Sequence, residues 1–478
     1  MATGSTLALS STGSPTEGDK LTFHWTTDAP DAKNWVGIYD GSRQPGTGSS
    51  LLWKYTPGTS GDVQLDTSAL TGGPYTAYLL AKDGYGILAR SAPFTFRPKP
   101  AVARPHAVVD VLAATPVTPG AAVSVKLGRL WIRPAGNPAG SPTFRRIGGD
   151  SWLSVAADGT VTGTAPAAPL AHPALVTVGV KDSAGATDTV VVQVPVIAPT
   201  APLRLKVAAW NLWDAGIHIT DALEKQLRVV LTQGLDALAL QETAGTGAQA
   251  LADALGWYAY QSAGSVGILS RYPLTAVTPV SASLPAAAAT LQLPGGRRVR
   301  LWAAHLSETG YGPYAAQDGS TAAQVEAAEN ASVRLQQAKA LATAVRADLD
   351  TGTGLVLAAG LASPSHLDWT AATAAAHSGV GPVSWPVTVA LQNAGLTDAF
   401  RLAHPDPAAA PGNTWSPTRK VRGSKPEPQD RIDQVQFGGP ITLVEAHTLA
   451  TGWPQADPNT AANGWPSDTA AAVATFTL

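Results

Sequence analysis

The sequence predicts a multidomain protein in which two all-β sandwich modules precede one layered α/β domain. Over roughly the first 200 residues, short strand-like runs alternate with turns rich in Gly, Pro and Asp, as they do in antiparallel sandwiches. From Leu203 onward, apolar strands alternate with helix-like segments, which is the pattern of a layered α/β fold. The 478 residues are also too many for one ordinary hydrophobic core.

The first predicted module covers residues 1–98. Its strand-like runs include LTFHWTT, NWVGIYD, SLLWKYT and YTAYLLAKD. Three of these runs contain a tryptophan, at Trp25, Trp35 and Trp53. The three fit either an aromatic platform for a ligand or the filling of a core, and the second role is commoner for this residue type. The Pro-rich segment RPKPAVARP follows and predicts a linker.

The second predicted module covers residues 107–199. Its strands lie in PVTPGAAVSVKL, SWLSVAADGTVTGTAP and ALVTVGVKDSAGATDTVVVQVPV, and the DG and AG pairs mark tight turns. The segment IAPTAP closes this module, which sets the next boundary between Pro199 and Leu203. The third predicted domain covers residues 203–478.

The third domain reads as strands and helices in alternation. LRLKVAAW (203–210) predicts a strand, DALEKQLRVVLTQ (221–233) an amphipathic helix, and LDALALQE (235–242) an apolar strand that ends in an acid. Residues 322–349 are rich in Ala, with Leu and Val at helical spacing, and predict one long helix. LVLAAG (355–360) predicts another buried strand. In such a fold, polar residues at strand ends point into a shared cleft.

Polar side chains stand where several of these strands begin or end. They are Asn211 in AAWNLWD, Glu242 in LALQET, His305 in LWAAHLSE, Asp433 in DRIDQVQF and Asp468 in WPSDTAAA. Each of them alone also fits a turn former or a helix N-cap. Their order along the chain, rather than any single residue, carries the functional interpretation.

Composition excludes several classes of protein. Charged residues make up 14% of the chain and the net charge is −2, so bulk basicity gives no nucleic-acid-binding signal, although Arg297, Arg298 and Arg300 leave room for a local basic groove. The absence of cysteine excludes disulfides and thiolate metal sites. No apolar run approaches the roughly 18 residues of a membrane span.

The balance of residue types also bears on location. A surface rich in Thr, Ser, Ala and Gly and poor in Lys predicts an extracellular protein. The first residues, MATGSTLALS, contain neither a basic nor an apolar segment of a signal peptide. The expectation is therefore an extracellular protein whose signal peptide is absent from this sequence, with an intracellular protein as the alternative.

The ordered set WN, QE, AHL, RID and PSD, together with SVGILSRYPL, resembles the endonuclease/exonuclease/phosphatase superfamily from Leu203 to Leu478. SWLSVAADGTVTGTAP resembles immunoglobulin-like repeats of bacterial proteins. The whole chain thus resembles a bacterial secreted member of this superfamily with two N-terminal immunoglobulin-like β modules. The resemblance implies a four-layered α/β sandwich and a divalent-metal-dependent phosphoesterase of the phosphodiesterase, phosphatase or nuclease type.

The resemblance also implies a role for each polar residue. Glu242 would be the main ligand of Mg²⁺ or Mn²⁺, with Asn211 beside it and Asp468 as a further ligand or orienting acid. Hard cations of this kind take oxygen ligands. His305 would donate a hydrogen bond to the phosphate, and Asp433 would orient a histidine base in the manner of a triad carboxylate.

Two motifs depart from the superfamily pattern. Where the pattern has Gly–Asp–x–Asn, this chain reads GLAS, with Leu361 and Ser363 in place of the Asp and the Asn. Where the pattern has Ser–Asp–His, this chain reads SDT, with Thr469 in place of the histidine. Leu cannot orient water, Thr is no base near neutral pH, and a general base alone contributes about 10²–10⁴ in rate. The sequence therefore predicts impaired catalysis with the metal ligands retained.

Four further residues are candidates for the substrate loops. His366 and Asp368 follow the GLAS turn in PSHLDW, and Tyr311 and Tyr314 lie in GYGPY after His305. Each of the four fits either contact with substrate or packing of its loop.

Three functions remain open from the sequence. The first is a phosphoesterase that has rebuilt its site from nearby groups. The second is a pseudoenzyme that acts as an extracellular binding or structural protein, and the third is an engineered variant of an active phosphoesterase. The ligand implied in each case is a phosphate ester, and the sequence sets no oligomeric state.

Overall fold

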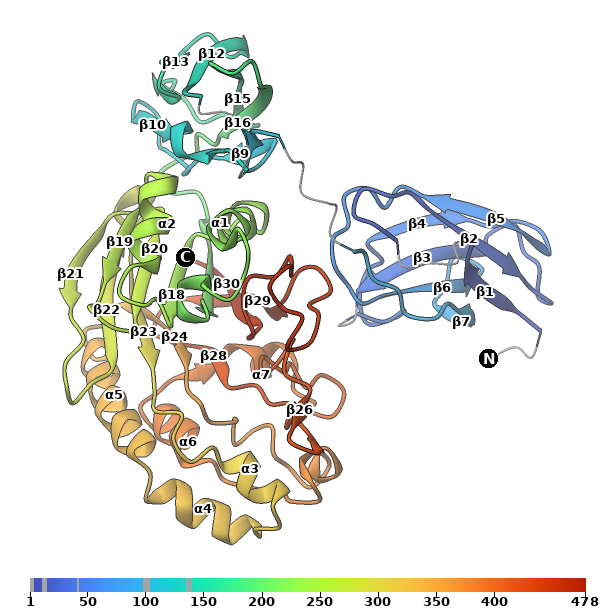
Figure 1. The fold of residues 1–478 in the computed structure, drawn as a ribbon, viewed down its shortest axis with the longest axis vertical. Coiled ribbons are helices and arrows are strands. Elements are labelled where there is room, and N and C mark those ends of the chain that lie inside the picture. Colours follow the sequence, from blue (N-terminus) through green and yellow to red (C-terminus); the bar gives the residue numbers. More distant parts are fainter. Residues whose placement is uncertain (1–3, 11–14, 41–42, 98–103, 135–136, 138–139) are drawn as a thin grey trace. The chain divides into compact units, whose positions relative to one another are not determined.

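The computed structural model describes residues 4–10, 15–40, 43–97, 104–134, 137 and 140–478 (Figure 1). Two compact units make up the chain. The first comprises the described residues of 1–101 together with 450–455 and 462–465, and the second comprises the described part of the remainder. The predicted linker RPKPAVARP falls mostly outside the described residues. The predicted boundary between Pro199 and Leu203 lies inside the second unit and stays a prediction.

The first unit contains two antiparallel sheets that share one core. The strands of the three-stranded sheet, in spatial order, are β1 (Thr6–Leu9), β2 (Leu21–Thr26) and β5 (Ser60–Leu65). Those of the four-stranded sheet are β4 (Leu52–Tyr55), β3 (Trp35–Asp40), β6 (Tyr75–Ala81) and β7 (Gly86–Arg90). Phe23 and Val63 of one sheet and Ile38 and Leu79 of the other lie in one buried cluster. The predicted sandwich is therefore present, while its likeness to immunoglobulin domains stays a prediction.

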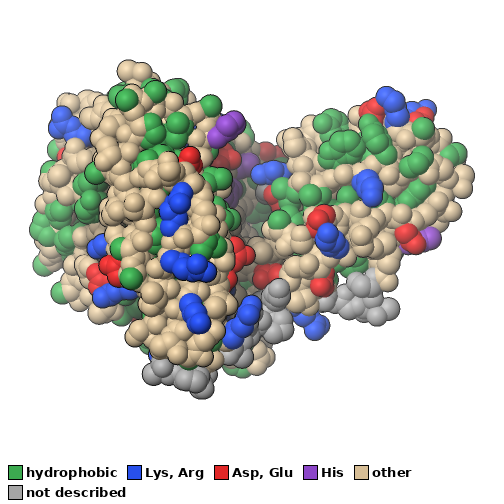
Figure 2. All heavy atoms as spheres, turned by 90° about the horizontal axis from the view of Figure 1, so that it is seen from above, with side chains coloured by type: hydrophobic (Ala, Val, Ile, Leu, Met, Phe, Trp, Pro, Cys, Tyr) green, Lys and Arg blue, Asp and Glu red, His purple; other side chains and the backbone are tan. Residues whose placement is uncertain are grey.

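The three tryptophans of the first module take different positions. Trp25 and Trp35 are buried, with 2% and 8% of their surface exposed, so core filling describes them. Trp53 is 55% exposed and its ring lies edge-on to those of Trp35 and Tyr55. Figure 2 shows that hydrophobic side chains also reach the surface of this module.

The second unit begins with the strands of the second module. They are β8 (His106–Ala107), β9 (Val111–Ala113), β10 (Ala122–Lys126), β11 (Trp131–Ile132), β12 (Pro142–Gly149), β13 (Leu153–Val155), β14 (Thr160–Thr164), β15 (Ala174–Asp182) and β16 (Thr187–Val194). Four of them form a sheet in the order β12-β15-β16-β9, and three form a sheet in the order β10-β14-β13.

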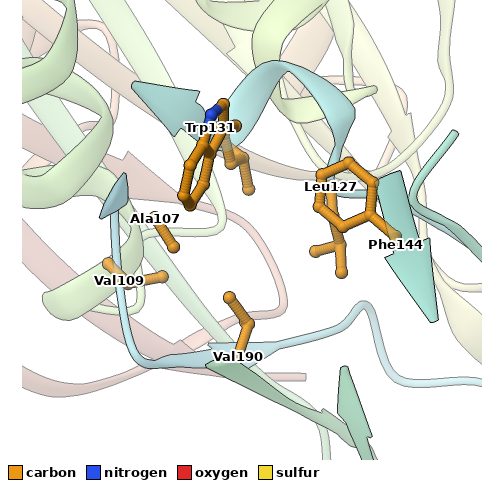
Figure 3. Close-up of a pocket in the computed structure, with 7 residues that line it drawn as sticks. Ala107, Val109, Leu127, Trp131, Phe144 and Val190 are labelled. Carbon is orange, nitrogen blue, oxygen red and sulfur yellow. The ribbon is translucent and has the colours of Figure 1, made fainter. Parts of the chain in front are cut away.

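An apolar cavity lies inside the second module (Figure 3). It is lined by Ala107, Val109, Leu127, Leu130, Trp131, Phe144 and Val190. Its volume of about 10 Å³ is at the lower limit for one water molecule, and its lining is almost wholly apolar. This cavity is an imperfection of packing rather than a binding site.

Two six-stranded sheets form the centre of residues 203–478. The strands of one sheet, in spatial order, are β19 (Tyr258–Gln261), β20 (Gly267–Ser270), β18 (Ala237–Gln241), β17 (Arg204–Asn211), β30 (Ala471–Thr477) and β29 (Thr442–Leu449). Those of the other are β21 (Leu274–Thr278), β22 (Ala286–Gln292), β23 (Arg298–His305), β24 (Gly354–Gly360), β28 (Asp433–Gly438) and β25 (Thr397–Asp398). A short hairpin of β26 (Val421–Arg422) and β27 (Lys425–Pro426) lies outside both.

The two sheets face each other across one core, because alternate residues of each strand point inward. Leu301 and Ala303 of β23 lie in the buried cluster that also contains Val207 and Ala209 of β17. The intervening Trp302 packs on the opposite face, in a cluster with residues of the helices outside the sheet.

Helices cover the outer faces of both sheets. They are α1 (Ala222–Thr232), α2 (Gly247–Leu255), α3 (Gly312–Gln317), α4 (Ala322–Asn330), α5 (Val333–Leu349), α6 (Pro386–Asn393) and α7 (Ala399–Ala403). Residues of α5 and α6 share the outer cluster of β22, β23 and β24, and α2 packs on β19 and β20. The resulting order of helix, sheet, sheet and helix is the four-layered sandwich that the resemblance implied (Figure 1).

The long helix predicted for residues 322–349 is in fact two helices. The helix is interrupted at Ala331 and Ser332, between α4 and α5. The Ser332 hydroxyl accepts a hydrogen bond from the backbone N–H of Leu335 at 3.1 Å and so caps α5. Ser competes with the backbone for hydrogen bonds and favours caps over helix interiors. The periodicity of Leu and Val predicted the helical residues but not this interruption.

In the part of the chain that the structure describes, we find no helix with both the length and the apolar character required to cross a membrane.

Candidate functional site

The polar residues predicted at strand ends lie at one edge of the two sheets because of strand direction. β17 and β18 are parallel and end together at Asn211 and Gln241. β23 and β24 are also parallel and end at His305 and Gly360, which are register partners. β28 runs the other way, so its first residue, Asp433, pairs with Gly360.

Gly360 is the point around which several of these side chains gather. A Cβ atom at this position would lie 3.3 Å from His305 Cδ2, 3.4 Å from Asp433 Oδ1 and 3.4 Å from Gln241 Cγ. Side chains from both sheets thus meet at one place.

Asn211 and Ser265 position the glutamate and the histidine. The Asn211 amide nitrogen donates to Glu242 Oε1 at 2.6 Å, and its amide oxygen accepts from the backbone N–H of Trp213 at 2.7 Å. The Ser265 hydroxyl oxygen accepts from the Glu242 backbone N–H at 3.1 Å and lies 2.6 Å from His305 Nδ1. Asn211 therefore orients the carboxylate of Glu242, while Ser265 joins the backbone of Glu242 to the ring of His305.

The other ring nitrogen of His305 faces an acid that the sequence reasoning missed. His305 Nε2 lies 3.2 Å from Glu308 Oε1. Burial opposes the charged form of His305, but the hydrogen bond and charge of Glu308, together with the charges of Glu242 and Asp433, raise the pKa of His305. The same hydrogen bond lowers the pKa of Glu308. The spacing His-x-x-Glu in AHLSE was the available signal for this pair.

The backbone near these residues is in an unusual conformation. Trp213, Asp214, Ala215 and Glu242 all have φ between 48° and 56°. Such left-handed conformations are costly for residues with a Cβ, and they concentrate at functional sites. The strained turn follows directly on Asn211 and carries the Trp213 N–H that its amide oxygen accepts.

Two buried aspartates with raised pKa values lie near these residues. Burial raises the pKa of Asp433 to about 7, and the charges of Asp468 and Glu242 add to this effect. Burial also raises the pKa of Asp468 to about 6, again with a contribution from Glu242. Asp433 Oδ2 is buried without a hydrogen-bond partner. Arg419 Nε lies 3.6 Å from Asp468 Oδ2 and opposes the rise in the pKa of Asp468, so the charge of these acids is partly compensated by the chain itself.

At the altered motif positions, the side chains turn away from the acids or bond locally. Leu361 is fully buried in the outer cluster with Val387 and Leu391. The hydroxyl of Ser363 donates to the carbonyl oxygen of Pro364 at 3.2 Å. The hydroxyl of Thr469 donates to Asp468 Oδ1 at 3.1 Å.

His366 and Asp368, the candidates that follow the GLAS turn, bond to residues outside this group. His366 Nδ1 lies 2.8 Å from Thr388 Oγ1, and its Nε2 lies 2.7 Å from Gln392 Oε1. Asp368 is buried and bonds to Arg401 Nε at 2.5 Å and to Arg431 Nη2 at 3.0 Å. Their contacts are those of residues that hold the surrounding loops in place.

The two tyrosines bond to acids of another loop. The Tyr311 hydroxyl donates to Asp430 Oδ2 at 2.9 Å, and that of Tyr314 donates to Glu427 Oε1 at 2.6 Å. Trp369 Nε1 donates to the second oxygen of Asp430 at 2.8 Å. Of the two roles predicted for the tyrosines, loop packing agrees with these contacts.

Among the described residues, one group of three acids and histidines is suited to hold a metal ion. Ligand atoms of Glu242, His305 and Glu308 all lie within 4.8 Å of one another. This set fits a divalent cation. The predicted main ligand, Glu242, belongs to the group, whereas the predicted further ligand, Asp468, does not.

Facing sheets between helices, with acids gathered at one end, define residues 203–478 as a four-layered α/β sandwich. No protein-family model matches the chain. The chain is 30% identical over 289 residues to the uncharacterized protein F14F9.5 of Caenorhabditis elegans, and the match covers 57% of this chain and 91% of that protein. The chain therefore belongs to the same family as this nematode protein.

Two solved structures are similar to more than half of the chain, each at low sequence identity. The catalytic domain of Xenopus laevis APE2 is 13% identical, with 57% of this chain and 91% of that chain covered and a TM-score of 0.37. An endonuclease/exonuclease/phosphatase family protein from Bacteroides thetaiotaomicron is 12% identical, with 58% and 99% covered and a TM-score of 0.34.

Proposed function

We propose that residues 203–478 form a domain that binds phosphate esters in the presence of a divalent cation, Mg²⁺ or Mn²⁺, and hydrolyses them poorly. The observation that carries the proposal is the contrast within one site. The groups suited to a cation converge at Glu242, whereas the position expected to orient water holds Leu361, whose side chain belongs to the hydrophobic core.

A bound cation would supply charge neutralisation for the phosphate oxygens. The chain's own residues would then have separate tasks. Glu242 would hold the cation and Asn211 would keep its carboxylate oriented. His305, whose raised pKa favours the protonated ring, would donate a hydrogen bond to a phosphate oxygen.

The missing steps are activation and orientation of the attacking water. Thr469 occupies the place of the base, and its hydroxyl is already bonded to Asp468. A hydroxyl of this kind does not accept a proton from water near neutral pH, so the expected rate lies below that of an intact site by at least the 10²–10⁴ that a general base contributes. The domain would therefore serve an extracellular binding or structural role, as a natural pseudoenzyme or as an engineered variant of an active phosphoesterase.

A second candidate, a phosphoesterase that keeps turnover, is favoured by one observation. His305 Nε2 lies 3.2 Å from Glu308 Oε1, and this pair could act as base and orienting acid in place of the lost histidine.

The deciding experiment compares hydrolysis of bis(4-nitrophenyl) phosphate with Mn²⁺ by the chain and by a variant carrying Leu361→Asp, Ser363→Asn and Thr469→His. A thermal melt of each protein establishes that it is folded, and Thr469→His alone serves as a second variant because it leaves the core leucine intact. Turnover that appears only on restoration supports the impaired site. Turnover by the unaltered chain that disappears in Glu308→Gln establishes the second candidate instead.

A further inference from the structure

The acids and the histidine at the end of β23 form a donor set that differs from an all-oxygen magnesium site. Three side chains contribute: Glu242 after β18, His305 at the end of β23, and Glu308 in the loop that follows. Two offer a carboxylate oxygen and one an imidazole nitrogen. Imidazole suits Zn²⁺ and other transition metals, whereas Mg²⁺ prefers oxygen and keeps several waters.

The distances allow the three groups to share one ion. Their ligand atoms lie within 4.8 Å of one another, and His305 Nε2 and Glu308 Oε1 are only 3.2 Å apart. Ligands bound at about 2.0–2.2 Å from a zinc ion are separated by roughly 3–4 Å. Glu308 has 67% of its side chain exposed and can move by the small remaining distance without disturbing the core.

Contacts behind the ligands fix two of them in place. Ser265 Oγ lies 2.6 Å from His305 Nδ1, which leaves Nε2 directed at Glu308. Asn211 holds one oxygen of Glu242 at 2.6 Å. Metal-binding histidines are commonly oriented in this way by a hydrogen bond at the second ring nitrogen.

A buried acid beside these ligands has one carboxylate oxygen without a partner. Asp433 has only 2% of its surface exposed, and its Oδ2 atom has no hydrogen-bond partner. Its other oxygen and the His305 ring lie around the same point above Gly360. Unpartnered buried carboxylate oxygens are costly unless a positive charge compensates them.

We propose that Glu242, His305 and Glu308 form a transition-metal site, selective for Zn²⁺ over Mg²⁺, with His305 Nε2 as its nitrogen ligand. This inference deepens the proposed function, on which it rests for the presence of a cation, by naming the class of that cation. On this assignment Glu308 is a metal ligand, and His305 binds the metal ion instead of donating a hydrogen bond to phosphate.

Calorimetric titration of the full chain with ZnCl₂, MnCl₂ and MgCl₂, each alone, tests the assignment. Co²⁺ serves as a spectroscopic probe, because its visible absorption reports nitrogen and oxygen ligation directly. Glu308→Gln removes an exposed ligand with no threat to folding, and His305→Gln removes the nitrogen. The control is Glu445→Gln, an exposed acid on the edge strand β29.

The expected result is one equivalent of Zn²⁺ bound, at least tenfold weaker in Glu308→Gln and in His305→Gln and unchanged in Glu445→Gln. The Co²⁺ spectrum should change in the same two variants. Mg²⁺ binding as tight as Zn²⁺ binding, or Zn²⁺ affinity unchanged in both ligand variants, overturns the assignment.

Parallel titration with inorganic phosphate separates this inference from the proposed function. If Mg²⁺ alone promotes phosphate binding through Glu242, the function stands and the transition-metal site is wrong. If Zn²⁺ binds through His305 but no cation promotes phosphate binding, the site stands and the function is wrong.

Discussion

Replacing Arg334 by methionine should destabilise the third domain and loosen the loop that carries Glu308. Arg334 lies near the start of α5, is fully buried, and bonds to Glu329 of α4 through Nη2–Oε1 at 2.6 Å and Nε–Oε2 at 3.3 Å. It also donates to the carbonyl oxygens of Ser307 at 2.6 Å and Gly310 at 3.0 Å. One guanidinium thus connects two helices to the segment on either side of Glu308.

The structure sets the size of the expected loss. Arg334→Met leaves Glu329, which is 1% exposed, as a buried charge without its partner, and breaking a buried pair in this way costs about 3–5 kcal/mol. For a domain of this size, such a loss corresponds to a fall in Tm of roughly 6–20 °C. Removing both charges together, with Glu329→Leu, should recover most of the loss because no unpaired charge then remains.

A second ion pair on the same helix provides the control. Arg346 and Asp350 of the α5 C-terminus are paired across one turn, with 59% and 56% of their side chains exposed. Exposed pairs contribute about 0–1 kcal/mol, so Arg346→Met should change stability little. Urea unfolding followed by circular dichroism measures both variants. Equal costs for Arg334→Met and Arg346→Met would refute the reasoning.

Two further predictions concern the contact between module and domain, and the altered motif. The hydrogen bond to Glu224 raises the pKa of His106. The stabilisation that this pair gives the folded protein is therefore complete below the ordinary histidine pKa near 6.5, and it is lost as pH rises through the raised pKa. The stability difference between the chain and His106→Gln should therefore shrink from pH 6 to pH 9 in urea unfolding, and a constant difference would count against the pair. Leu361→Ala should lower the free energy of unfolding by about 2–5 kcal/mol, because Leu361 is fully buried. Leu402→Ala, at a residue that is 54% exposed, should lower it little. Similar Tm values for the two variants would contradict the placement of Leu361 in the core.

The sequence predicted the strands and the end of the sheet at which the acids meet, because both follow from local pattern. The uniformly apolar run LVLAAG predicts a buried strand, and the polar residues that flank such runs mark Asn211, His305 and Asp433 as strand ends. The break at Ser332 was not predicted, since a cap and an interior serine look alike until the chain around them is placed.

The detailed contacts of the site could not be predicted from the sequence, because they too depend on how the surrounding chain is placed. The motif predicts Asn211 as a metal ligand. In the structure, its amide oxygen accepts from the Trp213 N–H and its amide nitrogen donates to Glu242. Glu308 has an exposed side chain in a loop, where acids are common, so only its distance from His305 singles it out. Long-range contacts of this kind depend on loop conformation, which no periodicity encodes.

The most direct test of the central claim is one measurement that follows ligand binding and product release together. Bis(4-nitrophenyl) phosphate is added to the chain and to Glu242→Gln, with and without Mn²⁺, while calorimetry reports binding and absorbance reports free 4-nitrophenol. Saturable binding that requires both Mn²⁺ and Glu242, with the bound ester largely intact at the end of the titration, is the predicted result. Rapid release of 4-nitrophenol that requires Glu242, or binding that ignores the cation, would contradict the account.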